Sequence, residues 1–434
     1  MKLSSAFNCS LAMLCAVAAL SPFSARAITW TGGGGTALAS NGDNWEGGMA
    51  PGAGDAVVLA ASCSSNMTWD LDVAVGSWTQ DGYTGAVTIA TQYGDAGFTN
   101  LVITGNCLLN TGTWTHRDNS SAETYRLRVT VGGDMTVGAA ARISTTGRGY
   151  DVGKGPGTPT SAHGGAGHGG EGDRSTFAGS APCYGSVCSP VNLGSGSKGY
   201  SQCGGGAILV NVAGELTVDG SIDADGTKYV DGAIKPHYGA SGGSVWLTAD
   251  AFAGTGKVSA VGSYVTTSYF GAGGRMALVQ TGPAADFSGF AGSARAVGSW
   301  TGSAQRGVAG TVYYETAADG RGGGILVVDG NETGTSEAFK TRILLDEQDA
   351  GFGPKSYVLK NNAYVEFSGG GATFHPGDTL VTTNKTRIYV RSGTTIDLRG
   401  TTFMGGGTTD RQIRMYAGSA MHVDDDFTFN DIIL

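Results

Sequence analysis

Short runs of alternating hydrophobic and polar residues fill most of the chain from residue 66 onward. In residues 69–75, WDLDVAV, nearly every second side chain is apolar. A period of two is typical of a strand with one buried face, and clusters of Gly, Asn and Asp separate the runs as turns do. No run combines a helical period with capping residues, so we expect essentially no helix. Further runs of this kind occupy residues 86–89, 101–104, 127–131, 135–137, 325–328, 363–367, 387–390 and 395–398.

A longer unit is superimposed on these runs between Gly204 and Gly298. It consists of a glycine cluster, a short apolar run, a gap and a second short run closed by glycine. A unit that recurs at about 30–40 residues is typical of a stacked-repeat architecture. A half-unit at residues 142–147 and a partial unit at 307–314 extend the stack in both directions. The full copies are 204–212 with 220–226, 241–249 with 256–262, and 271–279 with 292–298.

The repeat predicts a parallel β-helix. Its glycines suit sharp corners, because glycine adopts positive φ freely, and they let neighbouring coils approach closely. A β-sandwich would instead need hairpin turns of the Asn-Gly or Asp-Gly type, and the chain has few of them. The predicted fold is all-β, a right-handed parallel β-helix (β-solenoid) with an N-terminal cap and a large Gly-rich inserted loop. The side chains expected to stack into an inward apolar column are Ile208, Val210, Val245, Leu247, Met276 and Leu278.

The pattern divides the chain into segments of different character. The Gly/Cys-rich loop contains no convincing strand, and we expect it to leave the stack and return at Gly204. The last residues, Ile432-Ile433-Leu434, are apolar and uncapped, so we expect either a truncated sequence or a partner that covers this end. The segments are a signal peptide (1–27), a cap segment (28–65), first β-helix rungs (66–147), the Gly/Cys-rich loop (148–203), glycine-rich repeats (204–323) and C-terminal rungs (324–434).

Composition narrows the class of protein further. The chain has 76 Gly among 434 residues, but no three-residue glycine period, so it is not collagen-like. Its 40% hydrophobic residues are enough to bury a core. It carries 27 Lys and Arg against 36 Asp and Glu, and an acidic chain lacks the basic footprint of a nucleic-acid binder. We therefore expect no nucleic-acid partner.

The N-terminus has the pattern of a secretory signal peptide. Lys2 supplies the positive region, residues 11–20 (LAMLCAVAAL) are apolar, and residues 25–27 (ARA) match a small-x-small cleavage site. The apolar run is about half the roughly 20 residues that a membrane span requires, and no later stretch could form one. The sequence thus predicts a mature chain that starts at Ile28, is secreted or held at the cell surface, and has no transmembrane span.

Residues 28–60 carry a recognisable set of motifs. They contain Thr29-Trp30-Thr31-Gly32, then Asn44-Trp45, then residues 51–59 (PGAGDAVVL). This opening resembles the N-terminal segment of secreted bacterial surface proteins of the autotransporter-associated β-strand-repeat kind. The repeats of residues 204–298 are similar to the glycine-rich cores of secreted bacterial right-handed parallel β-helix proteins. The resemblance implies an extracellular β-helix rather than an activity, and Trp30 and Trp45 would plug its open end.

Five cysteines remain after the predicted cleavage, and export would permit disulfides between them. Cys183, Cys188 and Cys203 lie in one stretch, which favours a local bridge. The odd number leaves one thiol over, and the connectivity cannot be read from the sequence. The disulfide candidates are Cys63, Cys107, Cys183, Cys188 and Cys203.

The densest polar cluster lies between the first and second repeat copies, where we expect a loop that projects from the stack. A polysaccharide lyase needs a group that neutralises a uronate carboxylate, often Ca²⁺ held by Asp, and a Lys or Arg base. Asp223 and Asp225 are therefore candidate Ca²⁺ ligands, and no other cofactor is expected. A solvated loop explains the same residues more simply. The candidate catalytic residues are Asp223, Asp225, Lys228, Asp231, Lys235 and His237.

The sequence thus favours a non-enzymatic surface protein, an adhesin or structural passenger, with extracellular glycans or cell-surface components as partners. Two alternatives stay open. One is a carbohydrate-active enzyme, a polysaccharide lyase or glycoside hydrolase, acting through the cluster at residues 223–237. The other is a carbohydrate-binding module that uses exposed aromatic side chains such as Trp246, Tyr264 and Tyr269. His163 and His168, flanked by glycines, are poor metal ligands by themselves.

Overall fold

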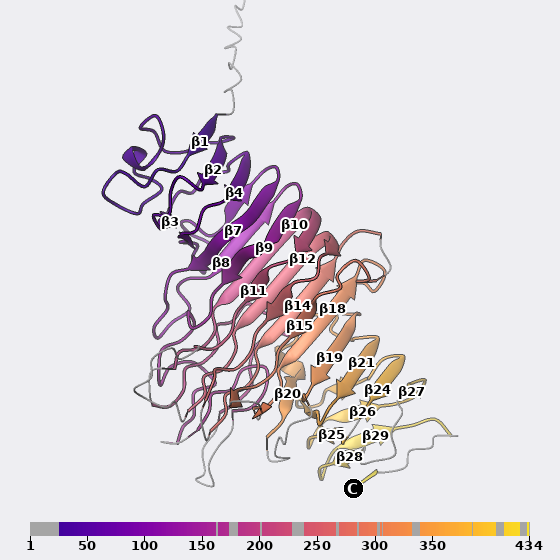
Figure 1. Ribbon diagram of the computed structural model, residues 1–434. Coiled ribbons are helices and arrows are strands. Elements are labelled where there is room, and N and C mark those ends of the chain that lie inside the picture. The colour runs from indigo at the N-terminus through magenta and orange to yellow at the C-terminus, as the bar shows by residue number, and fades with distance from the viewer. Residues whose placement is uncertain are drawn as a thin grey trace, which may run out of the picture.

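The computed structural model of the protein is all-β, as predicted (Figure 1). Within the described residues the helical content is two single 3-10 turns, η1 (Gly42–Asn44) and η2 (Leu345–Glu347). None of these residues belongs to a helix long and apolar enough to cross a membrane. The described residues are 26–161, 164–172, 181–199, 202–227, 238–265, 269–283, 286–301, 304–305, 307–331, 339–383, 385–404, 412–425 and 432–433.

The strands form a first stack in which each pairs in parallel with strands of neighbouring rungs (Figure 1). The predicted inward column is confirmed, because Ile208 pairs with Val245 and Val245 with Met276, all fully buried. Val210, Leu247 and Leu278 form a second buried column two residues along. The strands of this stack are β1 (Ala27–Thr29), β2 (Ala56–Ala60), β3 (Met67–Trp69), β4 (Ser77–Asp81), β5 (Ala86–Ile89), β6 (Leu101–Ile103), β7 (Cys107–His116), β8 (Leu127–Val131), β9 (Met135–Ser144), β10 (Ala207–Val218), β11 (Ser221–Asp223), β12 (Ser244–Ala253), β13 (Lys257–Ser259), β14 (Arg275–Gln280), β15 (Ser293–Arg295) and β18 (Thr311–Thr316).

Tryptophans fill the core at the N-terminal end of this stack. Trp30 and Trp45 are buried and meet edge-to-face, with ring centroids 5.0 Å apart. Trp45 contacts Trp69 in the same way, and the series continues through Trp78 to Trp114. Edge-to-face pairs contribute about 0.5–1.5 kcal/mol each beyond the area they bury. The two tryptophans of the predicted cap therefore lie where the apolar core would otherwise be open.

The glycine clusters form no strands, yet their amides are hydrogen-bonded in a regular pattern. Before β10, Gly206 donates to the segment after β9, Gly205 to the next rung, and Gly204 to the inserted segment 148–203. In a strand, the backbone hydrogen bonds of successive residues alternate between two sides. Here the amides of three successive residues donate in three different directions. This is the threefold period of a polyproline II-type helix. The pattern recurs before β12 and β14, so the glycine segments form a hydrogen-bonded layer of their own.

Close approach of backbones, not positive φ, explains the glycines of this layer. None of them has a positive φ, so the expectation that these clusters serve as left-handed corners is wrong. A Cβ added to Gly243 would lie 1.9 Å from the carbonyl oxygen of Gly206, and one added to Gly274 would lie 1.9 Å from that of Gly243. No side chain fits at such distances, because neighbouring backbones already fill the space.

The inserted segment 148–203 packs against this glycine layer. Its described parts contain no named strand, as predicted. It does not leave the stack, however: residues 164–172 are buried throughout, and the amide of Ala272 donates to the carbonyl of Ala166. The amides on the third side of the glycine segments need acceptors, and the inserted segment supplies them.

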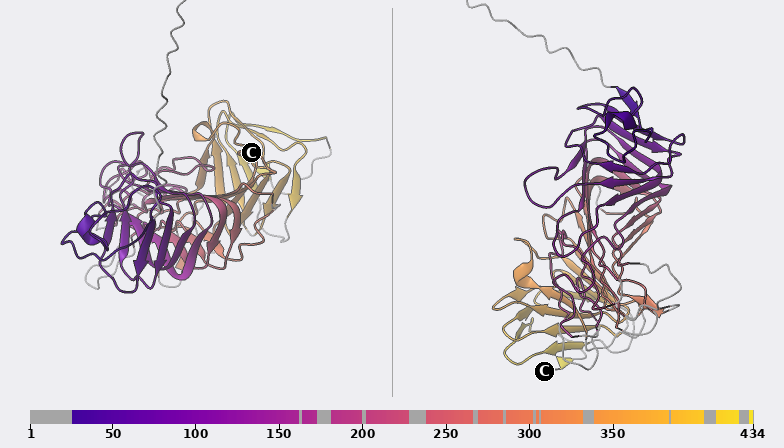
Figure 2. Two further views of the ribbon diagram at one scale, coloured as in Figure 1. Left: turned by 90° about the horizontal axis from the view of Figure 1, so that it is seen from above. Right: turned by 90° about the vertical axis from the view of Figure 1, so that its left-hand side faces the viewer.

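The chain reverses direction after the first stack. β18 pairs with β19 (Ile325–Asp329) in antiparallel fashion, and β19 then starts a second stack of parallel strands. The sheet is continuous across this junction, but its buried face changes: Val312 lies in the core of the first stack, whereas Tyr313 lies in the core of the second. Figure 2 shows that the second stack is displaced sideways from the axis of the first. Nothing in the hydrophobic pattern predicts this reversal.

Arg275 holds the junction together from inside. Its side chain is fully buried. Nε donates to the carbonyl oxygen of Tyr184 in the inserted segment at 2.7 Å, and Nη2 donates to the carbonyl oxygen of Arg342 in the second stack at 3.3 Å. One side chain thus ties three parts of the chain, since a buried guanidinium must satisfy its donors.

The second stack has three short sheets of parallel strands, which match the alternating runs of residues 325–398. Its strands bury one aromatic group, in which Tyr357 and Phe367 both contact Phe374. The remaining strands are β20 (Thr341–Leu344), β21 (Ser356–Lys360), β22 (Tyr364–Ser368), β23 (Thr373–Phe374), β24 (Thr379–Thr382), β25 (Arg387–Val390), β26 (Thr395–Asp397), β27 (Thr402–Met404), β28 (Gln412–Met415), β29 (Ala420–His422) and β30 (Ile432–Ile433), with a separate antiparallel pair, β16 (Trp300–Thr301) and β17 (Ala304–Gln305).

A glycine-to-alanine pair tests the close packing of the glycine layer. Gly243→Ala should destabilise the protein by about 3 kcal/mol or prevent folding, because the new methyl group overlaps a carbonyl oxygen. Gly370→Ala is the matched control: an added Cβ there meets nothing within 4 Å, so its effect should stay within about 0.5 kcal/mol. Urea unfolding midpoints measure both, and equal midpoints would contradict the packing described here.

Candidate functional site

Asp223 lies in the sheet rather than on a projecting loop, which corrects the prediction. It ends β11 and is 2% exposed. Arg142 Nε donates to its Oδ2 at 2.6 Å, Ser221 Oγ to the same oxygen at 3.1 Å, and Ser259 Oγ to Oδ1 at 3.1 Å. These partners come from β9, β11 and β13, so the carboxylate joins successive rungs. Its observed role is structural.

Asp225 follows the strand and is also buried, and its Oδ1 accepts the amide of Val261 at 2.8 Å. Within the described ranges no three His, Cys, Asp or Glu side chains converge as a metal site would require. The structure therefore places both candidate Ca²⁺ ligands in contacts between rungs. The other candidates of this cluster, Lys228, Asp231, Lys235 and His237, lie outside the described residues, as does His163.

All five candidate cysteines have free thiols, so the expected local bridge is not formed. Three of them lie in one stretch of sequence but in different surroundings. The Cys183 thiol faces the carbonyl oxygen of Lys340, Cys188 belongs to the second-stack core, and Cys203 lies 3.6 Å from Asp151 Oδ1. Burial raises the pKa of Cys183 and Cys188 to about 12 and that of Cys203 to about 11. Cys63 and Cys107 are buried in the first-stack core.

Two buried histidines are held in the neutral form by their surroundings. His168 stacks on Tyr184, with ring centroids 4.5 Å apart, and its Nδ1 lies 2.7 Å from the carbonyl oxygen of Gly242. Burial, together with the charge of Arg275, lowers its pKa to about 3. Burial lowers the pKa of His116 to about 4. These histidines contribute packing and backbone contacts, and no metal ligand set surrounds them among the described residues.

A groove on the outward face of the first stack has a volume of about 260 Å³. Its floor spans three rungs, because Arg128, Leu209 and Trp246 are neighbours in register on β8, β10 and β12. Neighbouring strands lie about 4.8 Å apart, so these side chains follow one line of about 10 Å along the stack. A second line beside it consists of Thr130, Asn211 and Thr248.

Two groove side chains also join apolar clusters to which the inserted segment contributes. Trp246 packs against the cluster that contains Val187 and Cys188, and Leu209 packs against the cluster that contains Leu193. Trp246 is half-buried, so part of the indole stays open to solvent. The rigid sheet thus presents one aromatic and one aliphatic side chain between polar groups.

Thr130 bonds the Asn100 side chain, but three other polar side chains of the groove have no partner among the described residues. These are Arg128, Asn211 and Thr248, and Trp246 Nε1 is buried without an acceptor. A buried donor without a partner costs about 1–3 kcal/mol, and such a group in a folded protein calls for an explanation. A ligand with several hydroxyl groups would supply partners for Arg128, Asn211 and Thr248.

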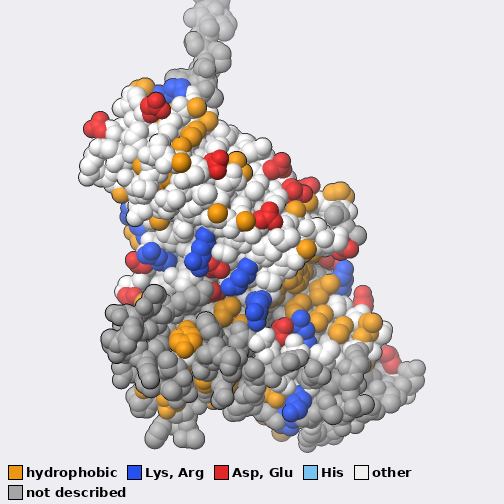
Figure 3. All heavy atoms as spheres, viewed as in Figure 1, with side chains coloured by type: hydrophobic (Ala, Val, Ile, Leu, Met, Phe, Trp, Pro, Cys, Tyr) orange, Lys and Arg blue, Asp and Glu red, His pale blue; other side chains and the backbone are white. Residues whose placement is uncertain are grey.

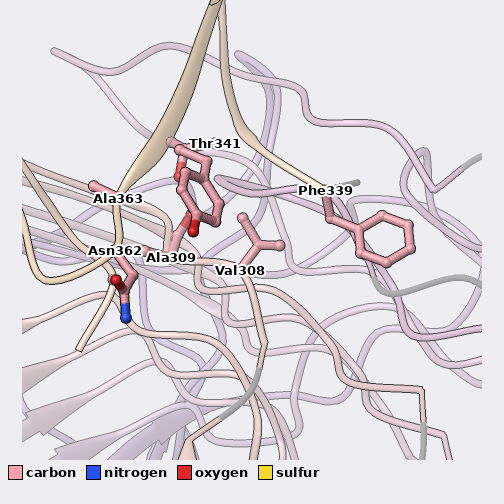
Figure 4. A pocket seen from close by; sticks show the side chains of 8 residues that line it. Val308, Ala309, Phe339, Thr341, Asn362 and Ala363 are labelled. Atoms are coloured by element: carbon pink, nitrogen blue, oxygen red, sulfur yellow. The ribbon is translucent and has the colours of Figure 1, made fainter. Parts of the chain in front are cut away.

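A second cavity, at the start of the second stack, is too small to bind a ligand. It is lined by residues that include Val308, Phe339, Thr341 and Asn362 (Figure 4). Its volume is about 10 Å³, about the space that one water molecule requires. It is a packing gap rather than a site.

The two other aromatic candidates lie away from this groove. Tyr269 stacks on Tyr238, with ring centroids 5.2 Å apart, beyond the ends of the strands. Trp246 is therefore the one predicted aromatic residue that lines the groove. Sequence reasoning missed Arg128 and Asn211, although both alternate with residues of the inward columns and so had to face outward.

Comparison with known proteins leaves this geometry as the only guide to function, since no family model, curated protein or solved structure matches the chain.

The buried histidines predict loss of stability in mild acid. Their pKa values lie below the ordinary 6.5, so between pH 6.5 and about 4 the unfolded chain binds more protons than the folded one. Stability should therefore fall as the pH drops through this range. Each histidine should contribute about 2 kcal/mol of loss between pH 6.5 and 5. Urea unfolding at pH 7 and pH 5 measures the difference.

A variant pair assigns this effect. His168→Gln removes one of the two buried imidazoles. The difference in the free energy of unfolding between pH 7 and pH 5 (the pH gap) should therefore shrink by about half. His375→Gln, at an exposed position of the second stack, should leave the gap as it is. An unchanged gap in His168→Gln would show that this imidazole is not buried as described.

Proposed function

We propose that the chain is a secreted, non-enzymatic surface protein of adhesive kind that binds an extracellular glycan in the groove around Trp246. The observation that carries this proposal is a groove in which Arg128, Asn211 and Thr248, whose side chains have no hydrogen-bond partner among the described residues, lie beside the half-buried ring of Trp246. Sugars present hydroxyl groups to such side chains and an apolar C–H face to an aromatic ring. A right-handed parallel β-helix would present them on a stiff, extended support.

The shape of the groove supports a chain-like ligand. Its lining residues lie in two lines across three rungs, so successive units of a polymer could meet Arg128, Leu209 and Trp246 in turn. The surrounding strands are fixed by ladders of backbone hydrogen bonds. A preorganised site of this kind loses little entropy on binding. Adhesion by one weak groove would be strengthened if many copies faced the same polymer.

The lyase alternative has no comparable support among the described residues. Asp223 is enclosed by Arg142 and two serines, and Asp225 accepts a backbone amide. Neither carboxylate lines the groove at Trp246 or the two other cavities of the described residues. The proposal therefore rests on binding and involves no chemical step.

Substitution at Trp246 tests the proposal. The mature chain is incubated with immobilised cellulose, xylan, chitin, alginate and polygalacturonate, and the affinity for each retained polymer is measured. Trp246→Ala should weaken binding about tenfold or more, because it removes the aromatic face. Trp246→Phe keeps a smaller aromatic face, so its affinity should lie between those of the unsubstituted chain and Trp246→Ala.

Arg399→Ala serves as the matched control, since this exposed arginine belongs to the second stack; it should bind as the unsubstituted chain does. Unfolding midpoints are recorded for every variant. Binding that survives Trp246→Ala unchanged would place the ligand elsewhere. Release of unsaturated uronate from alginate or polygalacturonate would contradict the non-enzymatic assignment.

A further inference from the structure

The second sheet of the first stack ends at an open edge. Its strands β9, β11, β13 and β15 pair in sequence through the rungs. β15 pairs with β13, and no other strand of the described residues pairs with its far side. The neighbouring sheet does not end here, because it continues from β18 into β19. On this side of the stack, then, the part of the chain that the structure describes supplies no strand after β15.

The burial of successive side chains shows the same gap. Ile143, Ile222 and Val258 are neighbours in register on β9, β11 and β13, and each is fully buried. The next residue of this column is Ala294 on β15, and it is only half-buried. Tyr314 likewise ends the column of Leu278 in a half-buried state. An apolar column that ends uncovered is what a terminal cap normally prevents.

A hollow of about 200 Å³ occupies the place of the missing strand. Its apolar lining comes from both stacks, with Ala294 and Val312 on one side and Val327 and Val358 on the other. The hollow exists because the sheet changes its buried face at the junction, so that Val327 and Val358 face outward from the second stack. Figure 3 shows a recess with hydrophobic side chains on this face of the molecule.

Positive side chains outnumber acidic ones around the hollow. Arg295 and Lys360 line it together with Asp329. Lys360 Nζ lies 3.3 Å from Asp329 Oδ2, and Arg295 Nη2 donates to Asn331 Oδ1 at 3.1 Å. Lys257 belongs to the strand before β15. In Figure 3, Lys and Arg side chains form a diagonal row over the region where Figure 1 labels β11 and β15. These side chains favour an acidic ligand at this place, although the total charge of the chain is negative.

The backbone of β15 has groups directed at the hollow. Ser293 N–H donates to the carbonyl oxygen of Gly256, and Arg295 accepts from the amide of Ala260, so both residues bond toward β13. Alternate residues of a parallel strand direct their amide and carbonyl groups to opposite edges. The N–H and C=O of Ala294 therefore point to the open side, where an added strand would meet them.

We propose that β15 is a docking edge for an extended peptide of a partner protein, which adds as a parallel strand and places an apolar side chain in the hollow between two acidic residues. Strand addition at an exposed edge draws affinity from main-chain hydrogen bonds and specificity from alternate side chains. The apolar residue continues the column of Val258 and Ala294. The acidic residues lie in register with Ser293 and Arg295, within reach of Lys257 and Lys360. This site is separate from the glycan groove.

A labelled peptide of the sequence Gly-Thr-Asp-Val-Asp-Thr-Gly-Ser is the probe, and its fluorescence anisotropy is measured with the full chain. The same peptide with lysines in place of the two aspartates is the control and should bind at least tenfold more weakly. Ala294→Pro removes the N–H donor that faces the hollow, which an edge strand tolerates, and should weaken binding of the acidic peptide at least tenfold.

Charge exchange provides a second test that does not depend on Ala294→Pro folding. Arg295→Glu should lower the affinity of the chain for the acidic peptide and raise its affinity for the lysine peptide. Arg399→Glu, on the second stack, should change neither affinity. The absence of measurable binding of the acidic peptide to the unsubstituted chain would overturn the proposal. Polygalacturonate is tested in parallel: binding that is lost in Arg295→Glu but kept in Ala294→Pro, with no peptide binding, would show a polyanion surface instead.

Discussion

Backbones that approach one another without intervening side chains determine this structure. An added Cβ would lie about 2 Å from a neighbouring carbonyl oxygen at Gly205, Gly243 and Gly274, so side chains are excluded there. Because the backbones lie so close, three successive amides can each donate a hydrogen bond to a different neighbouring segment. The β-ladders fix the stack on one side, and the glycine layer fixes it on the other. The inserted segment is held by the third set of these bonds.

The two proposed binding surfaces follow from this construction. Successive rungs place Arg128, Leu209 and Trp246 in one line on the outward face of the first stack. The continuous sheet then reverses chain direction between β18 and β19 and changes its buried face. Beside this junction no strand of the described residues follows β15, and a hollow lies there. Both surfaces lie on rigid strands, so their geometry is set before any ligand arrives.

The sequence was sufficient for features that depend on local alternation. The inward column through Ile208 and Val245 and the strand runs of the second stack could be predicted because a period of two determines which side chains are buried. Trp30 and Trp45 could be assigned to the cap for a similar reason, since large aromatic residues near a solenoid end have few other uses.

Other features depend on contacts between distant segments and could not be predicted. The residues between Thr316 and Ile325 are ordinary turn formers, and nothing local distinguishes a rung corner from a hairpin that reverses the chain. Asp223 looked solvated because the sequence does not show that Arg142 and Ser259 lie on adjacent rungs. Which outward positions stay open, as at Asn211, depends on where a long insertion packs.

Amide hydrogen exchange tests the central claim, that the glycine segments are a hydrogen-bonded layer and not loops. The exchange of the Gly205, Gly242 and Gly243 amides is compared with that of Val245 in β12 and of Gly370, an exposed glycine of the second stack. The account predicts that the three glycines of the layer are protected to about the same degree as Val245, because each donates to a buried carbonyl. Exchange as fast as that of Gly370 would contradict it.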